Sequence, residues 1–435
     1  MNFKKVISLA TLTTLSLSVV SCGTARIDSN LEAGFDNSIS RPVVDIASVA
    51  KKNGQIIPGE YIVKFKANSD SDTAISSVNA TKVKEIGNTG MHLIKMKDTG
   101  KVSISSLQSS LKGKIDWIEQ NRIMTLSYLD AKPLQENIVS LDDSFPNDPM
   151  FAKQYAHKVS NSVEGWKLSQ GNSDLVVAIV DTGVDGTHPE LKDKIVPGFD
   201  VYNPNTPDSA YKDPQGHGTH CAGIAAATGN NKIGVVGFAP NVKIQAVRVL
   251  DANGSGTYES VAEGIVWAGT HGAKVLSMSL GGPSSSKALD EAVALAIKND
   301  VIVIAAMGNS GNEKPSYPAA IKGVMAVAAT DSSDKRASFS QYGAHNSISA
   351  PGVNILSTFP LYDTGMPGKE YGSISGTSMS TPGVAGVAAL VRSKFPALKA
   401  EEVRAKIEKS ADDLGDKGWD KYYGAGRINV AGALK

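Results

Sequence analysis

The chain has 435 residues, more than the roughly 100–200 of one typical domain, so we expect two folded units. Its charge is nearly balanced, with 44 basic and 43 acidic residues, which excludes net charge attraction to nucleic acid or to an anionic membrane as its main mode of binding. Two cysteines, Cys22 and Cys221, exclude a disulfide framework.

The N-terminus has the pattern of an export signal over residues 1–21. Two lysines precede an apolar stretch, residues 6–20, that is too short to cross a bilayer as a helix. The stretch ends in Val19-Val20-Ser21-Cys22, which resembles a bacterial lipobox in which Cys22 carries a lipid. The alternative is an ordinary secretory signal with an incidental cysteine. We expect an exported envelope lipoprotein, and Gly23 favours the outer membrane by resemblance to Gram-negative lipoproteins.

Two segments with different patterns follow the signal. Residues 22–55 are rich in serine, asparagine and aspartate, which predicts a flexible tether without a fold of its own. Residues 56–127 are structured, with strands predicted at residues 61–65, 91–96 and 115–121 and helices at residues 75–83 and 102–111. We interpret this pattern as a small ferredoxin-like α+β domain of the order β-α-β-β-α-β.

The rest of the chain is a linker and a larger domain. Turn-forming residues predict a linker over residues 128–147. Residues 148–435 alternate helix-like stretches with apolar strands, predicted at residues 175–180, 243–249, 274–280, 301–306 and 324–328. Such runs predict an α/β fold in which helices cover both faces of a parallel sheet. Its functional site is expected beyond the carboxyl ends of the strands.

Three motifs in this domain supply an acid, a base and a nucleophile. They are Asp181-Thr-Gly-Val-Asp185, His217-Gly-Thr-His220 and Gly376-Thr-Ser-Met-Ser-Thr-Pro382. A serine hydroxyl needs an imidazole to take its proton, and the imidazole needs a carboxylate to fix its tautomer and stabilise its charged form. Asp181, His217 and Ser378 fit these three roles.

Each motif also has a plainer interpretation. Asp181 alone could be a turn residue at a strand end, and His217 with His220 could hold a metal from one helix face. A zinc hydrolase would need a general-base glutamate and further ligands in the motif, and these are missing here, so His220 is expected to be a packed helix residue. The local pattern at Ser378 also suits a helix N-cap, as it does at Thr377.

The order Asp, His, Ser, each in glycine-rich surroundings, resembles the subtilisin-like serine proteases, closest to their thermitase-like branch. The resemblance runs from about residue 147 to the C-terminus. It implies a subtilisin-like fold, peptide-bond hydrolysis through an acyl-enzyme, and Ser378 as the nucleophile. Attack on a carbonyl group creates an oxyanion, which the Ser378 backbone N–H would stabilise as a first donor. The resemblance implies that Asn309, in Ala306-Met-Gly-Asn-Ser-Gly311, is the second donor. The chain departs from the sequence motif that is usual in the family at Ser380 and Gly383.

The resemblance further implies a cleft in which two extended segments clamp a peptide as an added strand. The implied cleft residues are Gly254, Ser255, Gly256, Ser279, Leu280, Gly281, Gly282 and Ala306. The pocket for the residue before the cut would be apolar and roomy. We therefore expect a broad endopeptidase that cleaves after apolar or aromatic residues.

Calcium is the structural ion that the resemblance implies, because hard cations bind clustered oxygens. The implied ligands are the side chains of Asp148, Glu190 and Asn231 and the carbonyl groups of Thr228, Ile233 and Val235. The alternative is a plain Asn-Gly loop.

Two segments of the small domain resemble the inhibitory propeptide of subtilases. They are Gly59-Glu-Tyr-Ile-Val-Lys-Phe65 and Ile118-Glu-Gln-Asn-Arg122. The domain would then block the cleft until autocleavage near residues 128–147 releases the catalytic part. A generic binding domain is the alternative. We expect a monomer whose partners are polypeptide substrates and its own propeptide, and whose contact with a membrane is only through Cys22.

Two other functional classes are weighed against the protease. An inactive binding module would lack at least one of the four reacting groups, and this chain has them all. A serine esterase would not need the extended peptide clamp. Cys221 directly follows His220, and we expect it to be a passive core residue, since a reactive thiol needs exposure and positive neighbours.

Overall fold

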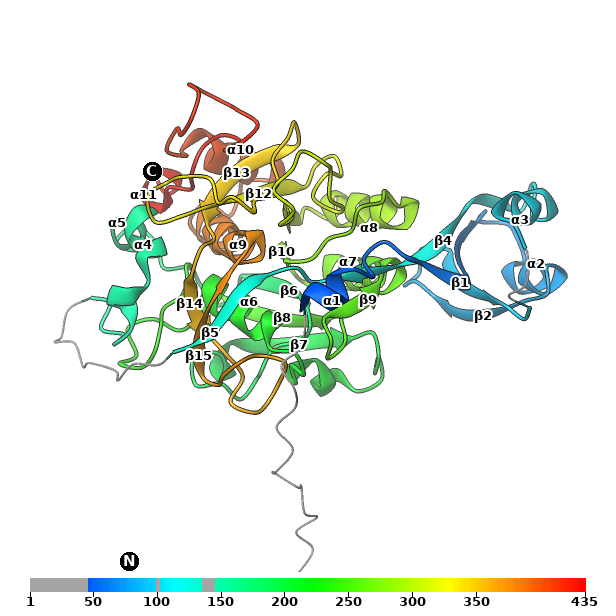
Figure 1. Ribbon diagram of the computed structural model, residues 1–435, viewed down its shortest axis with the longest axis horizontal. Coiled ribbons are helices and arrows are strands. Elements are labelled where there is room, and N and C mark those ends of the chain that lie inside the picture. The colour runs from blue at the N-terminus through cyan, green and yellow to red at the C-terminus, as the bar shows by residue number, and fades with distance from the viewer. Residues whose placement is uncertain (1–45, 99–101, 135–144) are drawn as a thin grey trace, which may run out of the picture. The chain divides into compact units, whose positions relative to one another are not determined.

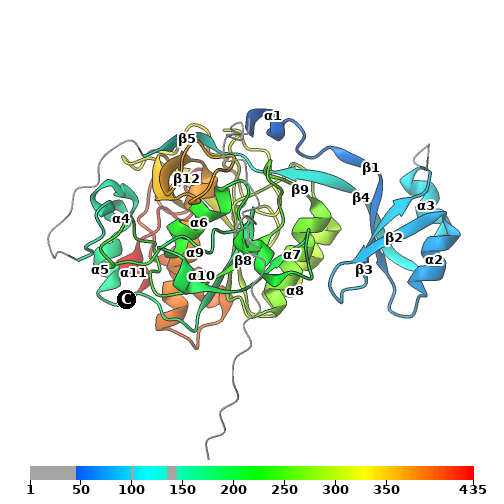
Figure 2. The same ribbon diagram turned by 90° about the horizontal axis from the view of Figure 1, so that it is seen from below.

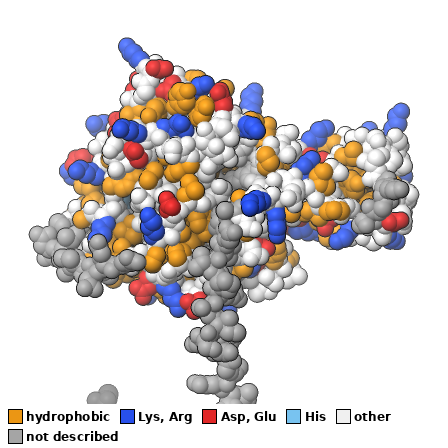
Figure 3. Space-filling model, viewed as in Figure 1, with side chains coloured by type: hydrophobic (Ala, Val, Ile, Leu, Met, Phe, Trp, Pro, Cys, Tyr) orange, Lys and Arg blue, Asp and Glu red, His pale blue; other side chains and the backbone are white. Residues whose placement is uncertain are grey.

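We describe a computed structural model that defines residues 46–98, 102–134 and 145–435 (Figure 1). The predicted export signal, Cys22 and most of the predicted tether lie outside these described residues. Of the helices in the defined ranges, none is long and apolar enough to cross a membrane. Basic and acidic side chains lie interspersed on the face shown in Figure 3.

The N-terminal domain is a four-stranded antiparallel sheet with two helices, which confirms the ferredoxin-like prediction. Its elements are β1 (Ile56–Phe65), α2 (Ser71–Ser77), β2 (Ala80–Glu85), β3 (Met91–Met96), α3 (Ile104–Ser110) and β4 (Ile115–Thr125). The strands lie in the order β2-β3-β1-β4. The helix predicted at residues 75–83 is wrong at both ends, since α2 begins at Ser71 and ends at Ser77. Asn79, in the left-handed conformation at φ 56°, follows the end of α2, and β2 begins at the next residue.

Strand β4 extends beyond its own sheet. Its last residues pair with β9 (Ser255–Thr257) of the C-terminal domain (Figures 1 and 2). The chain then forms β5 (Leu129–Pro133), which pairs with β15 (Tyr371–Ser375), itself paired with β14 (Ile355–Thr358). The predicted linker therefore begins with a strand, and the end of the predicted tether contains helix α1 (Ile46–Ala50).

The C-terminal domain has the predicted parallel sheet of seven strands, in the order β13-β12-β11-β10-β6-β8-β7. The strands are β6 (Val176–Asp181), β7 (Ile195–Asp200), β8 (Lys243–Arg248), β10 (Val275–Met278), β11 (Ile302–Ala306), β12 (Met325–Thr330) and β13 (Asn346–Pro351). The helices are α4 (Tyr155–Val159), α5 (Ser162–Trp166), α6 (His217–Ala226), α7 (Tyr258–Thr270), α8 (Lys287–Lys298), α9 (Thr377–Lys394), α10 (Ala400–Lys409) and α11 (Val430–Ala433).

Both faces of this sheet are covered, because alternate residues of each strand enter different cores. Val177 and Ile179 pack with α6 and α9, whereas Ala178 and Val180 pack with α7 and α8. Side chains of β1, β3 and β4 join the second core, so the N-terminal sheet packs directly on α7 and α8. The continuous apolar runs in the sequence reflect this two-sided burial.

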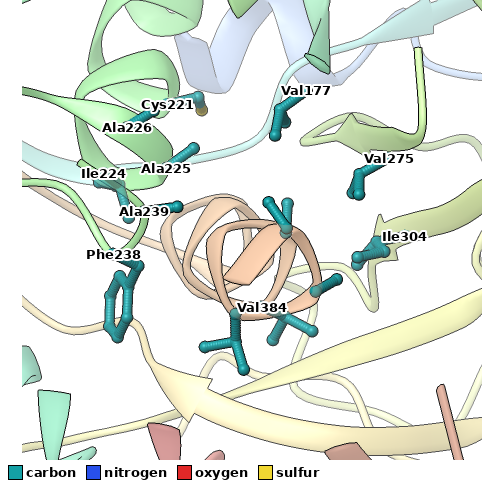
Figure 4. Close-up of a cluster of buried hydrophobic side chains, with 14 of the residues drawn as sticks. Val177, Cys221, Ile224, Ala225, Ala226, Phe238, Ala239, Val275, Ile304 and Val384 are labelled. Atoms are coloured by element: carbon teal, nitrogen blue, oxygen red, sulfur yellow. The ribbon is translucent and has the colours of Figure 1, made fainter. Parts of the chain in front are cut away.

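Helix α9 lies at the centre of the first core (Figure 4). Small residues let it approach its neighbours closely. A Cβ atom added at Gly386 would lie 2.6 Å from the Phe238 Cβ and 2.8 Å from the Ala225 carbonyl oxygen. This close packing fixes the helix that carries Ser378.

We predict that Gly386→Ala destabilises the protein by about 1–3 kcal/mol, because the added methyl group cannot fit without moving the neighbouring backbone. Ser393→Ala, on the same helix, is the matched control. The Ser393 hydroxyl is buried and has no hydrogen-bond partner in the described ranges, so its loss is expected to change stability by less than about 0.5 kcal/mol. Urea unfolding of both variants in a Ser378→Ala background measures the difference. Equal stabilities would contradict the packing argument.

Candidate active site

The structure brings the acid and the base of the three motifs into contact. Asp181 ends β6, His217 begins α6, and both side chains are buried. The Nδ1 atom of His217 lies 2.9 and 3.0 Å from the two Asp181 carboxylate oxygens. Since a carboxylate accepts hydrogen bonds, Nδ1 carries the proton and Nε2 is left with its lone pair, which is the tautomer that a general base needs.

The electrostatics of this pair favour the charged imidazole. Burial by itself lowers the pKa of His217, but the charge and the hydrogen bond of the Asp181 carboxylate, with a smaller contribution from Cys221, more than reverse this effect. The pKa of His217 is therefore held well above its ordinary value. The site is built to stabilise an imidazolium once His217 has accepted a proton.

A second buried carboxylate, Asp213, ties the acid and the base together. It accepts hydrogen bonds from the backbone N–H groups of Gly216 (2.7 Å) and Thr219 (2.8 Å) at the start of α6. It also accepts from the hydroxyl of Thr182, the residue after Asp181, at 2.8 Å. Sequence analysis missed Asp213. An aspartate shortly before a helix is a capping signal, and that signal would have been enough to single it out.

Ser378 lies in the first turn of α9 and faces a carbonyl group of its own chain. Its Oγ atom lies 3.3 Å from the Ser127 carbonyl oxygen and 3.2 Å from that of Ser279. The Nε2 atom of His217 is buried and has no hydrogen-bond partner among the described residues. The bond between nucleophile and base is therefore not formed in this state, and the Ser378 hydroxyl must rotate to make it.

Asn309, in the loop after β11, donates from its Nδ2 atom to the same Ser127 carbonyl oxygen. Thr377 fixes the orientation of the Asn309 amide, because the Asn309 Oδ1 atom accepts hydrogen bonds from both the N–H and the hydroxyl of Thr377, each at 2.9 Å. This arrangement places a donor where negative charge would develop on the Ser127 oxygen. Thr377, considered from sequence only as a helix cap, positions that donor.

The end of β4 occupies the predicted cleft as an extended peptide. Met124 pairs with Gly256 and Thr125 with Ser255 on one side, while Thr125 also bridges to Gly281 on the other. The Leu126 N–H donates to the Gly254 carbonyl oxygen at 2.9 Å. Of the predicted clamp residues, Gly282 differs, since it pairs with Tyr317 instead of the inserted strand.

A cavity of about 130 Å³ lies beside Ser127. Four of the predicted cleft residues line it, namely Ser279, Leu280, Gly281 and Ala306. Ala50 and Asn53, from the end of the predicted tether, also line it, and the Asn53 Nδ2 atom donates to the Gly281 carbonyl oxygen at 2.8 Å. In the described part of the chain, no charged side chain lines this cavity.

The two predicted calcium carboxylates meet at one loop. Asp148 and Glu190 are fully buried. Glu190 accepts from the Asn231 side chain at 2.8 Å and from the Val235 N–H at 2.9 Å, and Asp148 accepts from the Asn230 N–H at 2.8 Å. Burial raises the pKa of Glu190 to about 7, and the charge of Asp148 adds to this rise. Two buried carboxylates that repel each other suit a divalent cation.

The remaining predicted ligands belong to the same loop. Thr228 donates from its N–H (3.1 Å) and its hydroxyl (3.0 Å) to the Glu190 carbonyl oxygen, and Ile233 donates its N–H to the Asn231 Oδ1 atom at 3.1 Å. The residues present therefore fit a calcium site, provided that the Asn231 amide turns its oxygen toward the ion.

His220 contacts β14 and β15, whereas the Cys221 sulfur lies with Asp181 and His217 in a cluster compact enough to share an ion. The Nε2 atom of His220 lies 3.0 and 3.2 Å from the carbonyl oxygens of Ile355 and Gly372. Burial lowers the pKa of His220 to about 3, so it stays neutral. The Cys221 sulfur is buried 3.8 Å from the His217 Nδ1 atom, and burial raises the pKa of its thiol.

Comparison with known proteins gives matches over both domains. The sequence profile described as the subtilase family matches residues 172–426, and that described as the fervidolysin N-terminal prodomain matches residues 42–110. Thermitase of Thermoactinomyces vulgaris is 46% identical over 292 residues, 67% of this chain and 99% of thermitase. A thermophilic serine proteinase of Bacillus sp. strain AK1 is 35% identical over 443 residues, which cover 100% of both chains.

Solved structures give the same picture. Fervidolysin of Fervidobacterium pennivorans, described as a keratinolytic enzyme related to subtilisin, matches with a TM-score of 0.73 at 29% identity. The match covers 87% of this chain and 61% of the fervidolysin chain. A protease of Pseudoalteromonas arctica matches with a TM-score of 0.61 at 31% identity, covering 67% of this chain and 99% of that protein.

We predict that Asp181→Asn lowers the pKa of His217, because the substitution removes the largest effect that raises it, the charge of the Asp181 carboxylate. NMR titration of the imidazole protons in a Ser378→Ala background measures this pKa. Cys221→Ala is the control. Cys221 also raises the pKa of His217, but by less than Asp181 does, so its removal is expected to lower the pKa less. A shift as large as that of Asp181→Asn would contradict the assignment.

Proposed function

Since this chain belongs to the subtilase family of serine proteases, we propose that it is a secreted endopeptidase of broad specificity, made as a zymogen that cleaves itself between Ser127 and Tyr128. One observation carries the proposal. The Ser127 carbonyl group lies against both the Ser378 hydroxyl and the Asn309 amide, with the residues before it held as a strand in the cleft. This geometry is that of a substrate before attack.

The chemistry follows from these contacts. Ser378 Oγ attacks the Ser127 carbonyl carbon while His217 Nε2 takes the hydroxyl proton, and the oxyanion receives the Asn309 N–H. His217 then gives its proton to the Tyr128 nitrogen as the C–N bond breaks, which leaves an acyl-enzyme on Ser378. A water molecule, deprotonated by His217, releases Ser127 as a new carboxyl terminus. His217 must be neutral to begin, so the rate falls as the pH drops through its pKa.

Polar contacts support the role of the N-terminal domain as an inhibitor. Glu119 accepts hydrogen bonds from the Ser286 hydroxyl (2.6 Å) and from the N–H groups of Lys287 (2.9 Å) and Ala288 (3.1 Å), so it caps the start of α8. An anion at a helix N-terminus is stabilised by the helix dipole. The domain therefore stays docked by contacts that do not depend on the Ser127–Tyr128 bond.

Ion pairs strengthen the same interface. Lys84 lies 2.8 Å from Glu259 and 2.5 Å from Glu263 on α7, and Lys64 lies 2.8 Å from Glu291 on α8. Glu259 is almost fully buried, so loss of its cationic partner would leave an uncompensated charge. After cleavage, the domain is expected to remain in the cleft as a bound inhibitor.

The proposed preference for apolar or aromatic residues before the cut rests on the cavity beside Ser127. Serine leaves about 130 Å³ open there, and Leu280 and Ala306 contribute apolar walls. The uncharged lining gives a lysine or arginine side chain no counter-charge. The residue before the proposed cut, Ser127, is too small to fill this cavity, and Ala50 and Asn53 line it as well.

Calcium is proposed as the structural ion of the loop around Asp148 and Glu190. When bound, it would neutralise the two carboxylates and hold residues 228–235 in place. Asn231 would contribute its side-chain oxygen. Export and lipidation at Cys22 remain predictions from sequence, because residues 1–45 lie outside the described ranges. A monomeric state likewise remains a prediction.

The wild-type chain is expected to convert to a fragment that begins at Tyr128, whereas Ser378→Ala stays at full length. Mass spectrometry and N-terminal sequencing identify the fragment. Ser380→Ala is the matched control, since its hydroxyl bonds the Ala350 carbonyl oxygen, at 2.9 Å, and takes no part in the chemistry. Cleavage in Ser378→Ala, or a new N-terminus elsewhere, would overturn the proposed bond.

Calcium at 100 times its dissociation constant is expected to stabilise the Ser378→Ala protein by about 2.7 kcal/mol. Glu190→Gln should abolish most of this gain, while Asp363→Asn, an exposed carboxylate, should keep it. Thermal unfolding with calcium and with a chelator measures both. An equal calcium effect in Glu190→Gln would rule out this loop as the site.

A further inference from the structure

We propose that Gln215 and Met366, together with the ring of His217, form a subsite that selects tyrosine as the residue after the cut. The inference rests on the proposed cleavage between Ser127 and Tyr128. It specifies which residue the enzyme prefers directly after the cleaved bond, on the side of the leaving group. Its occupant is part of the structure, because Tyr128 is the residue that follows the Ser127 carbonyl group.

The aromatic ring of Tyr128 stacks on the catalytic base. Its centroid lies 5.4 Å from that of the His217 imidazole, and the two rings are 19° from parallel. Tyr128 also packs against the buried side chains of both cores of the C-terminal domain. An aromatic side chain is therefore bound here by a large contact area, whereas alanine would leave the space unfilled.

The hydroxyl of Tyr128 has a partner on each side. It accepts a hydrogen bond from the Gln215 Nε2 atom at 2.9 Å and donates to the Met366 sulfur at 3.8 Å. Burial raises the pKa of Tyr128 to about 12, which keeps the hydroxyl protonated and able to donate. Phenylalanine would fill the same space but would leave the Gln215 donor unpaired.

Both partners also have contacts that do not involve Tyr128. The Oε1 atom of Gln215 accepts the His217 N–H at 2.9 Å, so the amide must present its Nε2 atom to the subsite. Met366 is 5% exposed, and a Cβ atom added at Gly216 would lie 2.5 Å from its Cγ atom. Gly216 has φ 104°, a conformation that glycine adopts without strain. These contacts orient Gln215 and Met366 independently of Tyr128.

Stacking also couples the subsite to the reaction. His217 becomes positively charged when it takes the Ser378 proton, and its ring then lies parallel to the face of the Tyr128 ring. The face of an aromatic ring attracts a cation within about 6 Å of its centroid. An aromatic residue after the cut therefore stabilises the state that follows proton transfer more than the state before it, so it should raise the rate and not only the binding.

The test is a double-mutant cycle in the full chain, where processing is a single first-order event. Tyr128→Phe is expected to slow processing about fivefold, the value of one neutral hydrogen bond, and Tyr128→Ala to slow it at least about tenfold more. Gln215→Leu should reduce the ratio between tyrosine and phenylalanine to about one. Because Gln215 also holds the His217 N–H, only this ratio within each background is interpreted.

Met366→Ala supplies a second, independent variant. It is expected to slow the chains with tyrosine or phenylalanine at position 128 more than the chain with alanine there. Quenched peptides with the sequence Ile-Met-Thr-Leu-Ser followed by Tyr, Phe or Ala repeat the comparison in trans with the processed enzyme, once the N-terminal domain has been separated from it. They share one acyl half, so differences in kcat/KM report on the leaving-group side alone.

Tyrosine preferred in both assays, with a ratio that disappears in Gln215→Leu, would support the subsite. Equal rates for tyrosine and phenylalanine, or a ratio unchanged by Gln215→Leu, would overturn it while leaving the protease function intact. Absence of any cleavage in the wild type would overturn the proposed function and the subsite together.

Discussion

The parallel sheet imposes the constraint on which the site depends. All its strands end at the same edge, so residues that follow different strands meet there whatever their distance along the chain. Asp181 ends β6, Ser279 follows β10 and Asn309 follows β11. Helix α9, packed against the same sheet through small residues, brings Ser378 to this edge. A shift of α9 relative to the sheet would separate the Ser378 hydroxyl from His217 and Asn309.

Buried charge is concentrated at that edge, and each charge has a defined partner. Asp181 is held by His217, and Asp213 is surrounded by donors from the start of α6 and from Thr182. These contacts offset the cost of burying carboxylates, and they also fix the position and tautomer of the base. Stability and catalytic geometry therefore depend on the same hydrogen bonds.

The N-terminal domain uses the substrate's own mode of binding. Its last strand continues into the cleft and pairs with β9, so the inhibitor and the bond to be cut are one continuous segment. Glu119 and Lys84 hold the domain at α7 and α8 through contacts that do not include the bond to be cut. Different contacts therefore bind the domain to the enzyme and place Ser127 in the cleft. The domain can remain bound after the bond is broken.

The sequence by itself determined the family, the α/β fold and the ferredoxin-like domain, because motif order and hydrophobic period are local properties of the chain. It also singled out Asp181, His217, Ser378 and Asn309, whose catalytic roles remain proposals. Tertiary structure alone decided which carbonyl group faces them. Ser127 is 251 residues from Ser378 and 182 from Asn309, and no local pattern encodes such contacts. The same reason hid Gln215 and Met366, whose roles come from what folding places beside them.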